Sequence, residues 1–147
     1  MNRPILAFAI LLVLDTATAS AEPSLSIQVD GCAATKTGMV SQARSPWITI
    51  DPKIEVVGGS IRYIRAGEHQ CCRQVEILQQ VQKSKIVLTE YWTGEGCRCV
   101  CFSQIEATLT NLVSGDYEVT VYSGGIATTT HSNIEPKALL SQTVRIP

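Results

Sequence analysis

The chain has 147 residues, with 12 basic and 13 acidic side chains, so its formal charge near pH 7 is −1 with histidine neutral. A near-neutral chain without a basic run has no electrostatic basis for binding nucleic acid or an anionic membrane surface. The 6 cysteines are the most informative part of the composition.

The N-terminus has the three parts of a secretory signal peptide. Arg3 provides a positive charge, residues 5–14 form an apolar run too short to span a bilayer, and Ala19-Ser20-Ala21 is a small-residue cleavage site. We therefore predict a signal peptide over residues 1–21 and a single domain over residues 22–147.

The expected cellular location follows from this segment, from the position of the first cysteine and from the lack of a second apolar run. The first cysteine, Cys32, lies well beyond the cleavage site, and no second long apolar run follows it. We expect a secreted or periplasmic protein with no lipid anchor and no membrane span.

Short apolar stretches that alternate with polar residues predict strands throughout the mature chain. The ranges are 25–29, 47–50, 54–57, 61–64, 75–81, 86–92, 97–102, 105–109, 117–121 and 140–146. Asp51-Pro52 is expected to end the second strand, and residues 123–137 are expected to form a loop. Gly58-Gly59 and Lys83-Ser84 are expected to be tight hairpin turns.

The strand pattern predicts an all-β fold, an antiparallel β-sandwich that is immunoglobulin-like and stapled by disulfides. A short amphipathic helix within residues 70–85 is the alternative to one strand, but the isoleucine and valine content favours the strand. Leu112, Gly115 and Tyr117 are spaced as in a tyrosine corner, in which a strand tyrosine bonds to nearby backbone. A plain turn followed by a strand tyrosine remains the alternative.

Five cysteines lie between residues 71 and 101, as a vicinal pair and an alternating triplet. On a strand, the triplet at 97, 99 and 101 would share one face, with neighbours about 7 Å apart, which suits disulfide geometry poorly. The register set by the Lys83-Ser84 turn places Cys71 opposite Gly96. We therefore predict that Cys71 or Cys72 bonds to Cys97 or Cys99.

Structural disulfides are the expected state in an exported chain with an even number of cysteines. The candidates are Cys32, Cys71, Cys72, Cys97, Cys99 and Cys101. The alternative is a thiolate site for Cu or Zn, since both metals bind sulfur and imidazole ligands. Its candidate ligands are His69, Cys71, Cys72, Cys97, Cys99 and Cys101. Because the triplet lacks zinc-ribbon spacing, no cofactor is the first expectation.

No catalytic motif is present, so we expect the protein not to be an enzyme. The chain has no G-x-S-x-G, H-E-x-x-H or C-x-x-C motif. Glu90, Glu95 and Glu106 are expected to be solvated. Tyr91 and Trp92 are adjacent, so one is expected to face the core while the other is a candidate partner-binding side chain.

Three patterns together carry a resemblance. They are Cys71-Cys72, then Gly94-Glu95-Gly96-Cys97 continuing to Phe102, then the L-x-x-L-x-x-G-x-Y-x-V pattern of residues 109–119. This arrangement resembles small exported Cys-rich β-sandwich proteins of bacteria. The resemblance implies the fold class and carries over no functional residue. Many members look like lipoproteins, and this chain lacks the cysteine for a lipid anchor.

The sequence leads to an expected function of limited detail. We expect an exported, disulfide-stabilised, non-enzymatic binding module for a protein or another extracytoplasmic ligand. One alternative is a periplasmic thiolate protein for Cu or Zn. Another is a secreted hydrolase inhibitor, in which residues 93–96 or 123–137 enter a cleft.

Overall fold

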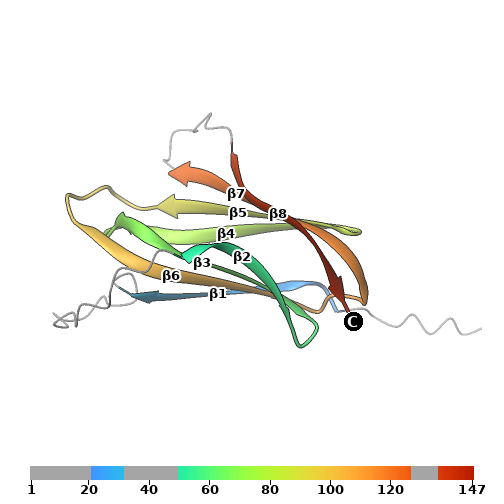
Figure 1. Ribbon diagram of the computed structural model, residues 1–147. Helices are drawn as coiled ribbons and strands as arrows, with labels where there is room; N and C mark the ends of the chain where they lie inside the picture. Colours follow the sequence, from blue (N-terminus) through green and yellow to red (C-terminus); the bar gives the residue numbers. More distant parts are fainter. Residues whose placement is uncertain (1–20, 32–49, 127–135) are drawn as a thin grey trace, which may run out of the picture.

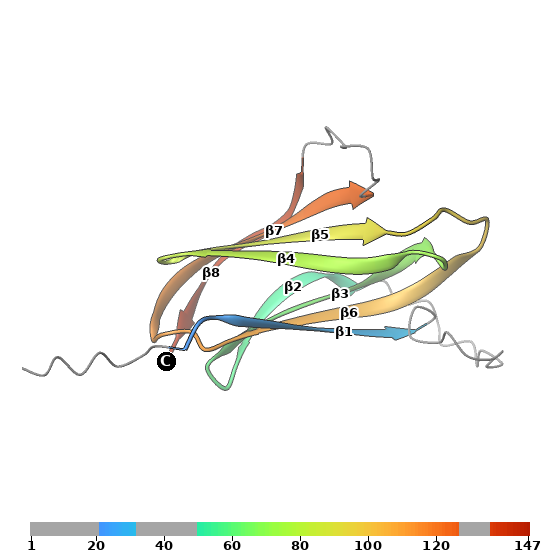
Figure 2. The same ribbon diagram turned by 180° about the vertical axis from the view of Figure 1, so that it is seen from behind.

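The computed structural model describes residues 21–31, 50–126 and 136–147, and these residues form strands in two layers with no helix (Figure 1, Figure 2). The strands are β1 (Ser24–Gly31), β2 (Ile50–Val57), β3 (Ser60–Gln70), β4 (Gln74–Gln82), β5 (Lys85–Thr93), β6 (Val100–Thr110), β7 (Gly115–Ile126) and β8 (Lys137–Ile146). One sheet has the order β1-β6-β3-β2 and the other β4-β5-β7-β8. The predicted all-β class is confirmed.

Two predictions near the N-terminus concern residues outside the described ranges. The predicted signal peptide lies outside the described residues except for Ala21, and Cys32 also lies outside them. Within the described ranges, no helix has the length and apolar character needed to cross a membrane.

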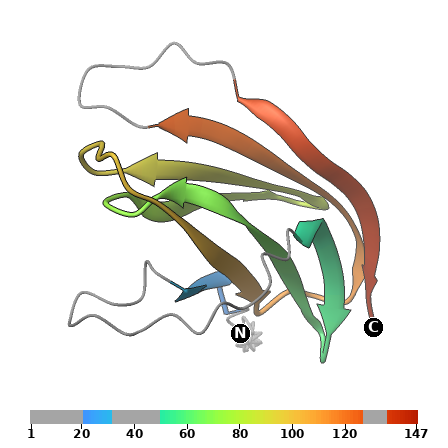
Figure 3. The ribbon, with the colours of Figure 1, turned by 60° about the vertical axis from the view of Figure 1, so that its left-hand side comes forward.

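Strand alternation builds the core between the sheets. Every second residue of β3, β5, β6 and β7 points inward, because side chains alternate across a strand. The fully buried aliphatic side chains include Ile61, Ile86, Leu109 and Val119. On one side β2 contacts β8, which brings the two sheets together there (Figure 3).

The two predicted hairpin turns are confirmed. Val57 pairs with Ser60 across Gly58-Gly59, and Gln82 pairs with Lys85 across Lys83-Ser84. Both turn glycines have positive φ, 55° and 79°, as a primed turn requires. Because residues 74–82 form β4, the helical alternative for this region is wrong.

Two predicted boundaries are wrong. β2 continues through Asp51 and Pro52 instead of ending there, and its register with β3 shifts between Ile50 and Lys53. An edge strand tolerates proline at such an irregularity, because the missing N–H is not needed in a ladder. The loop predicted at 123–137 is wrong at both ends, since β7 extends to Ile126 and β8 begins at Lys137, and residues 127–135 lie outside the described residues.

The pairing is also not antiparallel throughout, because β5 and β7 are parallel neighbours. The chain crosses from β5 to the other sheet as β6 and then returns as β7. Two reversals restore the direction of β5, so the two strands run the same way when they become adjacent. The tyrosine-corner bond is present: the Tyr117 hydroxyl donates to the Val113 carbonyl at 2.8 Å.

Candidate functional site

Two connections between the sheets lie at the same end of the two layers and form the candidate site. Residues 71–73 carry the chain from β3 to β4, and residues 94–99 carry it from β5 to β6. We call these two segments the disulfide tip. Figure 1 shows them together at one end of the two layers.

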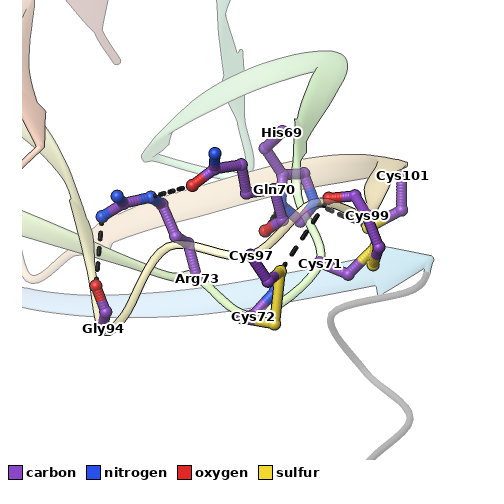
Figure 4. Close-up of a disulfide and its surroundings, with 9 residues drawn as sticks. All are labelled: His69, Gln70, Cys71, Cys72, Arg73, Gly94, Cys97, Cys99 and Cys101. Carbon is purple, nitrogen blue, oxygen red and sulfur yellow. Dashed lines mark hydrogen bonds between the residues drawn. A yellow bond between two sulfur atoms is a disulfide. The ribbon is translucent and has the colours of Figure 1, made fainter.

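Two disulfides join the segments of the tip (Figure 4). Cys71 bonds to Cys99 and Cys72 bonds to Cys97, with Cα–Cα distances of 5.6 and 5.9 Å. The Cys71 amide also donates to the Cys99 carbonyl at 3.2 Å. The predicted bond between the vicinal pair and the downstream cysteines is present, and it occurs twice.

The route to this pairing differs from the predicted one. β4 and β5 pair only as far as Gln74 and Thr93, so the hairpin register does not extend to the cysteines. Cys97 and Cys99 precede β6 instead of lying on one strand face, and Cys101 alone of the triplet belongs to β6. Cys101 is buried and is itself disulfide-bonded.

Arg73 connects the two segments of the tip to each other and to the end of β3. Its Nε donates to Gln70 Oε1 at 2.7 Å and its Nη1 donates to the Gly94 carbonyl at 3.1 Å (Figure 4). Gly94 has φ +91°, and a Cβ there would lie 3.1 Å from the Cys72 carbonyl oxygen. Glycine at 94 therefore permits both the turn and the close approach of the two segments.

His69 lies directly behind the tip, at the end of β3. Its ring stacks on Trp92 with centroids 4.4 Å apart. His69 Nδ1 lies 2.9 Å from the Gln70 carbonyl, which can only accept, so in this contact Nδ1 carries the proton. In the neutral ring, Nε2 then accepts from the Ser103 hydroxyl at 2.9 Å, and Cys101 Sγ lies 3.6 Å away.

Deeper between the sheets, Glu90 is completely buried and accepts hydrogen bonds from three side chains. Arg65 Nη2 donates at 2.6 Å, the Trp92 indole at 3.0 Å and the Tyr63 hydroxyl at 3.2 Å. Burial raises the pKa of the Tyr63 phenol, and the charge of Glu90 raises it further. Tyr63 therefore stays a donor well into the alkaline range.

The prediction that Glu90 is solvated is wrong. Ile86, Leu88, Glu90 and Trp92 alternate along β5, so position 90 falls on the inward face. This alternation along β5 was the sequence feature that could have predicted the burial of Glu90. Glu95 is exposed and Glu106 is half-buried with an ion pair to Arg62 at 3.4 Å.

The adjacent aromatics divide as expected, with Trp92 facing the core and Tyr91 on the other face of β5. Tyr91 is half-buried, and its ring lies so close to Gly124 of β7 that a Cβ there would overlap it. Tyr91 therefore covers a neighbouring strand, and its exposed area is limited.

The disulfide bonds determine whether the tip can bind a metal. Cys71, Cys72, Cys97 and Cys99 are paired with one another, so they offer no thiolates to a metal. Among the described residues, no group of three or more histidine, cysteine or acidic side chains is arranged to hold a metal ion. What the site presents is a rigid, exposed surface supported by a buried polar network.

Comparison with known proteins identifies no match: no family model, no curated protein and no solved structure is similar to this chain.

Proposed function

We propose that this protein is an exported, disulfide-stabilised, non-enzymatic binding module that contacts a protein or another extracytoplasmic ligand through the disulfide tip. The observation that carries the proposal is the double disulfide between segments 71–73 and 94–99. A surface whose backbone is already ordered loses little conformational entropy on binding.

The tip and the strand that follows it present suitable contact groups. Glu95 and Arg98 of the tip are exposed, and Val100 at the start of β6 is 60% exposed although it is apolar. An apolar side chain close in sequence to an acidic and a basic one resembles the mixed surface of a protein-binding patch.

We also propose that the sandwich is immunoglobulin-like in outline. Two four-stranded sheets and the Tyr117 corner support this proposal, whereas the parallel β5–β7 pair is a departure from that topology. The resemblance to small exported Cys-rich β-sandwich proteins of bacteria is retained as part of the same proposal.

Site-directed photocrosslinking in the exporting cell tests the binding surface. A photoreactive residue at position 95 or 98 is expected to form a specific adduct that mass spectrometry can identify. The matched control is position 83 or 84, which is also exposed and lies in the hairpin turn between β4 and β5. Equal crosslinking from both ends, or none from the tip, would show that the tip is not the contact surface.

A metal-binding function is the second candidate, and one observation favours it. Reduction would release cysteine thiols beside His69, whose Nε2 already lies 3.6 Å from Cys101 Sγ. Native mass spectrometry with Zn or Cu(I), before and after treatment with a dithiol reductant, tests this candidate. A metal adduct together with alkylatable thiols in the protein as exported would replace the binding-module proposal.

Hydrolase inhibition is a more specific form of the binding proposal. The bond from Arg73 to the Gly94 carbonyl holds the start of the exposed 94–96 segment, as an inhibitory loop requires. Inhibition of a hydrolase panel that is lost on Glu95→Lys and kept on Lys83→Glu would support this form. Inhibition that is unchanged by Glu95→Lys would exclude this loop.

A further inference from the structure

The edge strand β4 lacks the features that normally prevent edge strands from pairing with another chain. Among the described residues it pairs with β5 on one side only. Its sequence, Gln74-Val-Glu-Ile-Leu-Gln-Gln-Val-Gln82, has no proline or lysine and a single charge at Glu76. Leu78 at its centre is 57% exposed. Such an edge is a template for strand addition.

Two other edge strands differ in this respect. β2 contains Pro52 and an irregular register, and it contacts β8 across the layers. β8 has basic residues near both of its ends, Lys137 and Arg145. Irregularity and basic side chains protect an edge strand from pairing, and β4 has neither.

The hairpin turn determines which backbone groups of β4 face its open edge. In a two-residue hairpin the flanking pair, here Gln82 and Lys85, exchanges both of its hydrogen bonds. Even-numbered residues of β4 therefore bond to β5. The odd-numbered residues direct their N–H and C=O groups to the open edge, and these are Val75, Ile77, Gln79 and Val81.

We propose that β4 pairs antiparallel with β4 of a second copy of this chain about a two-fold axis at Leu78. In this register Ile77 faces Gln79 of the copy and Val75 faces Val81, so all four outward-directed residues find hydrogen-bonded partners. Leu78 faces Leu78 of the second copy at a non-hydrogen-bonded position, where side chains of paired strands approach most closely. Self-complementarity of this kind defines a two-fold interface.

The charge pattern of β4 favours a second copy of this chain as the pairing partner. Glu76 falls opposite Gln80 of the copy instead of opposite another carboxylate, and Gln74 falls opposite Gln82. Two copies of β4 can therefore pair without placing like charges opposite each other. The two-fold axis makes the Glu76–Gln80 contact occur twice.

The interface continues into the opening between the sheets. An open groove of about 610 Å³ lies between β4 and β1, with Leu25, Ile27 and Ile77 among its lining residues. The Gln79 side chain donates to the Pro23 carbonyl at 3.1 Å and holds this end of β1 beside β4. Pairing through β4 would bring two such grooves together and remove exposed apolar surface from water.

Sedimentation equilibrium of the purified protein over a wide concentration range tests the proposal. We expect a reversible monomer–dimer equilibrium that Leu78→Lys weakens at least about tenfold, because like charges would then face each other. The matched control is Val113→Lys, which changes an apolar residue that is 64% exposed and outside β4. Circular dichroism verifies that both variants remain folded. A monomer at every concentration, or a dimer that both variants affect equally, would overturn the proposal.

The register has its own test at position 80. Gln80→Lys would place a cation opposite Glu76 of the copy and is expected to tighten the dimer about threefold or more, whereas Gln80→Glu would weaken it by a similar factor. Gln82→Lys, which faces a neutral side chain, is the control and should leave the equilibrium within about twofold. A dimer that responds equally to all three changes is not paired in this register, and the proposal would be wrong.

Discussion

Glu90 places a carboxylate between the two sheets with no exposed surface. Removing a charge from water is costly unless other groups replace the lost hydrogen bonds. Arg65, Tyr63 and Trp92 do so from two strands, and Trp92 also stacks on His69. This network joins β3 to β5 across the layers and ends directly behind the disulfide tip.

Glu90→Ala is expected to lower the free energy of unfolding by about 2–4 kcal/mol, because it leaves the charge of Arg65 without its partner. The effect should lie toward the lower end of values for buried pairs, since the Arg65 side chain is 24% exposed. Denaturant unfolding measures it. The control is Glu118→Ala, whose partner Lys85 lies 3.6 Å away and is 72% exposed. That change should cost less than about 0.5 kcal/mol, and equal effects would contradict the role given to burial.

The raised pKa of Tyr63 predicts a loss of stability in alkali. Above about pH 10 the unfolded chain releases the phenolic proton while the folded protein keeps it. Because the folded state then binds more protons, the free energy of unfolding falls as the pH rises. The slope approaches about 1.4 kcal/mol per pH unit for one group.

Unfolding of Tyr63→Phe between pH 9 and 12 measures this contribution. The variant should be less stable at neutral pH by about 1 kcal/mol, because Glu90 loses a donor. Its decline above pH 10 should be shallower than that of the parent protein. The same change at Tyr122, a half-buried residue of β7, is the control. Parallel profiles for the parent and Tyr63→Phe would show that Tyr63 does not control the alkaline transition.

At the scale of elements, the β2–β3 hairpin depends on the backbone of its turn. Gly59 has φ +79°, and a Cβ there would meet no atom within 4 Å. Any cost of a side chain at this position is therefore conformational and does not come from a clash. The turn positions Ile61 and Tyr63 on the inward face of β3 by setting the register at Val57 and Ser60.

Gly59→Ala is expected to destabilise the protein by about 1 kcal/mol, because an L-residue is strained at positive φ. Gly67 is the matched control, since it also has open space around a new Cβ but shows no positive φ. Gly67→Ala should be neutral or stabilise by up to about 1 kcal/mol, because it restricts the unfolded chain. Thermal and denaturant unfolding compare the two. The turn would not require glycine if both variants had the same stability.

At the scale of the whole molecule, the two disulfides act on nearly the same loop. Their sequence separations are 28 and 25 residues, and both close the loop that contains β4 and β5. Closing one loop of this size stabilises a fold by about 3.5 kcal/mol in the chain-entropy model. A second bond beside the first removes little additional freedom from the unfolded chain.

A double-mutant cycle tests this overlap. Cys71→Ser with Cys99→Ser, and separately Cys72→Ser with Cys97→Ser, should each cost clearly less than about 3.5 kcal/mol. Removing all four cysteines should cost more than the sum of these two effects. Alkylation and intact mass verify that each variant keeps its other bond. Additive costs would show that the two bonds act independently. The disulfide expected for Cys32 stays a prediction that peptide mapping can test.

The faces of the strands could be predicted from the sequence with good success. Ile105, Ala107 and Leu109 alternate and are all buried, and the Lys83-Ser84 turn sets the expected register of β4 and β5. These features depend on period-two alternation and on turn residues, both of which are local. The predicted position of Cys71 opposite Gly96 failed because β4 begins only at Gln74 and β5 ends at Thr93, so the cysteines lie outside the paired strands.

The amino-acid pattern alone established an all-β chain, its tight turns and a link between the vicinal cysteines and the downstream triplet. Which strands become neighbours was decided only by the tertiary structure, as the parallel β5–β7 pair and the double disulfide between two crossovers show. Alternation says which side of a strand is apolar, but it does not say which strand packs beside or above it. The burial of Glu90 could therefore be predicted from its position in the alternation of β5. Its partners Arg65 and Tyr63 could not, because they come from a strand of the opposite sheet.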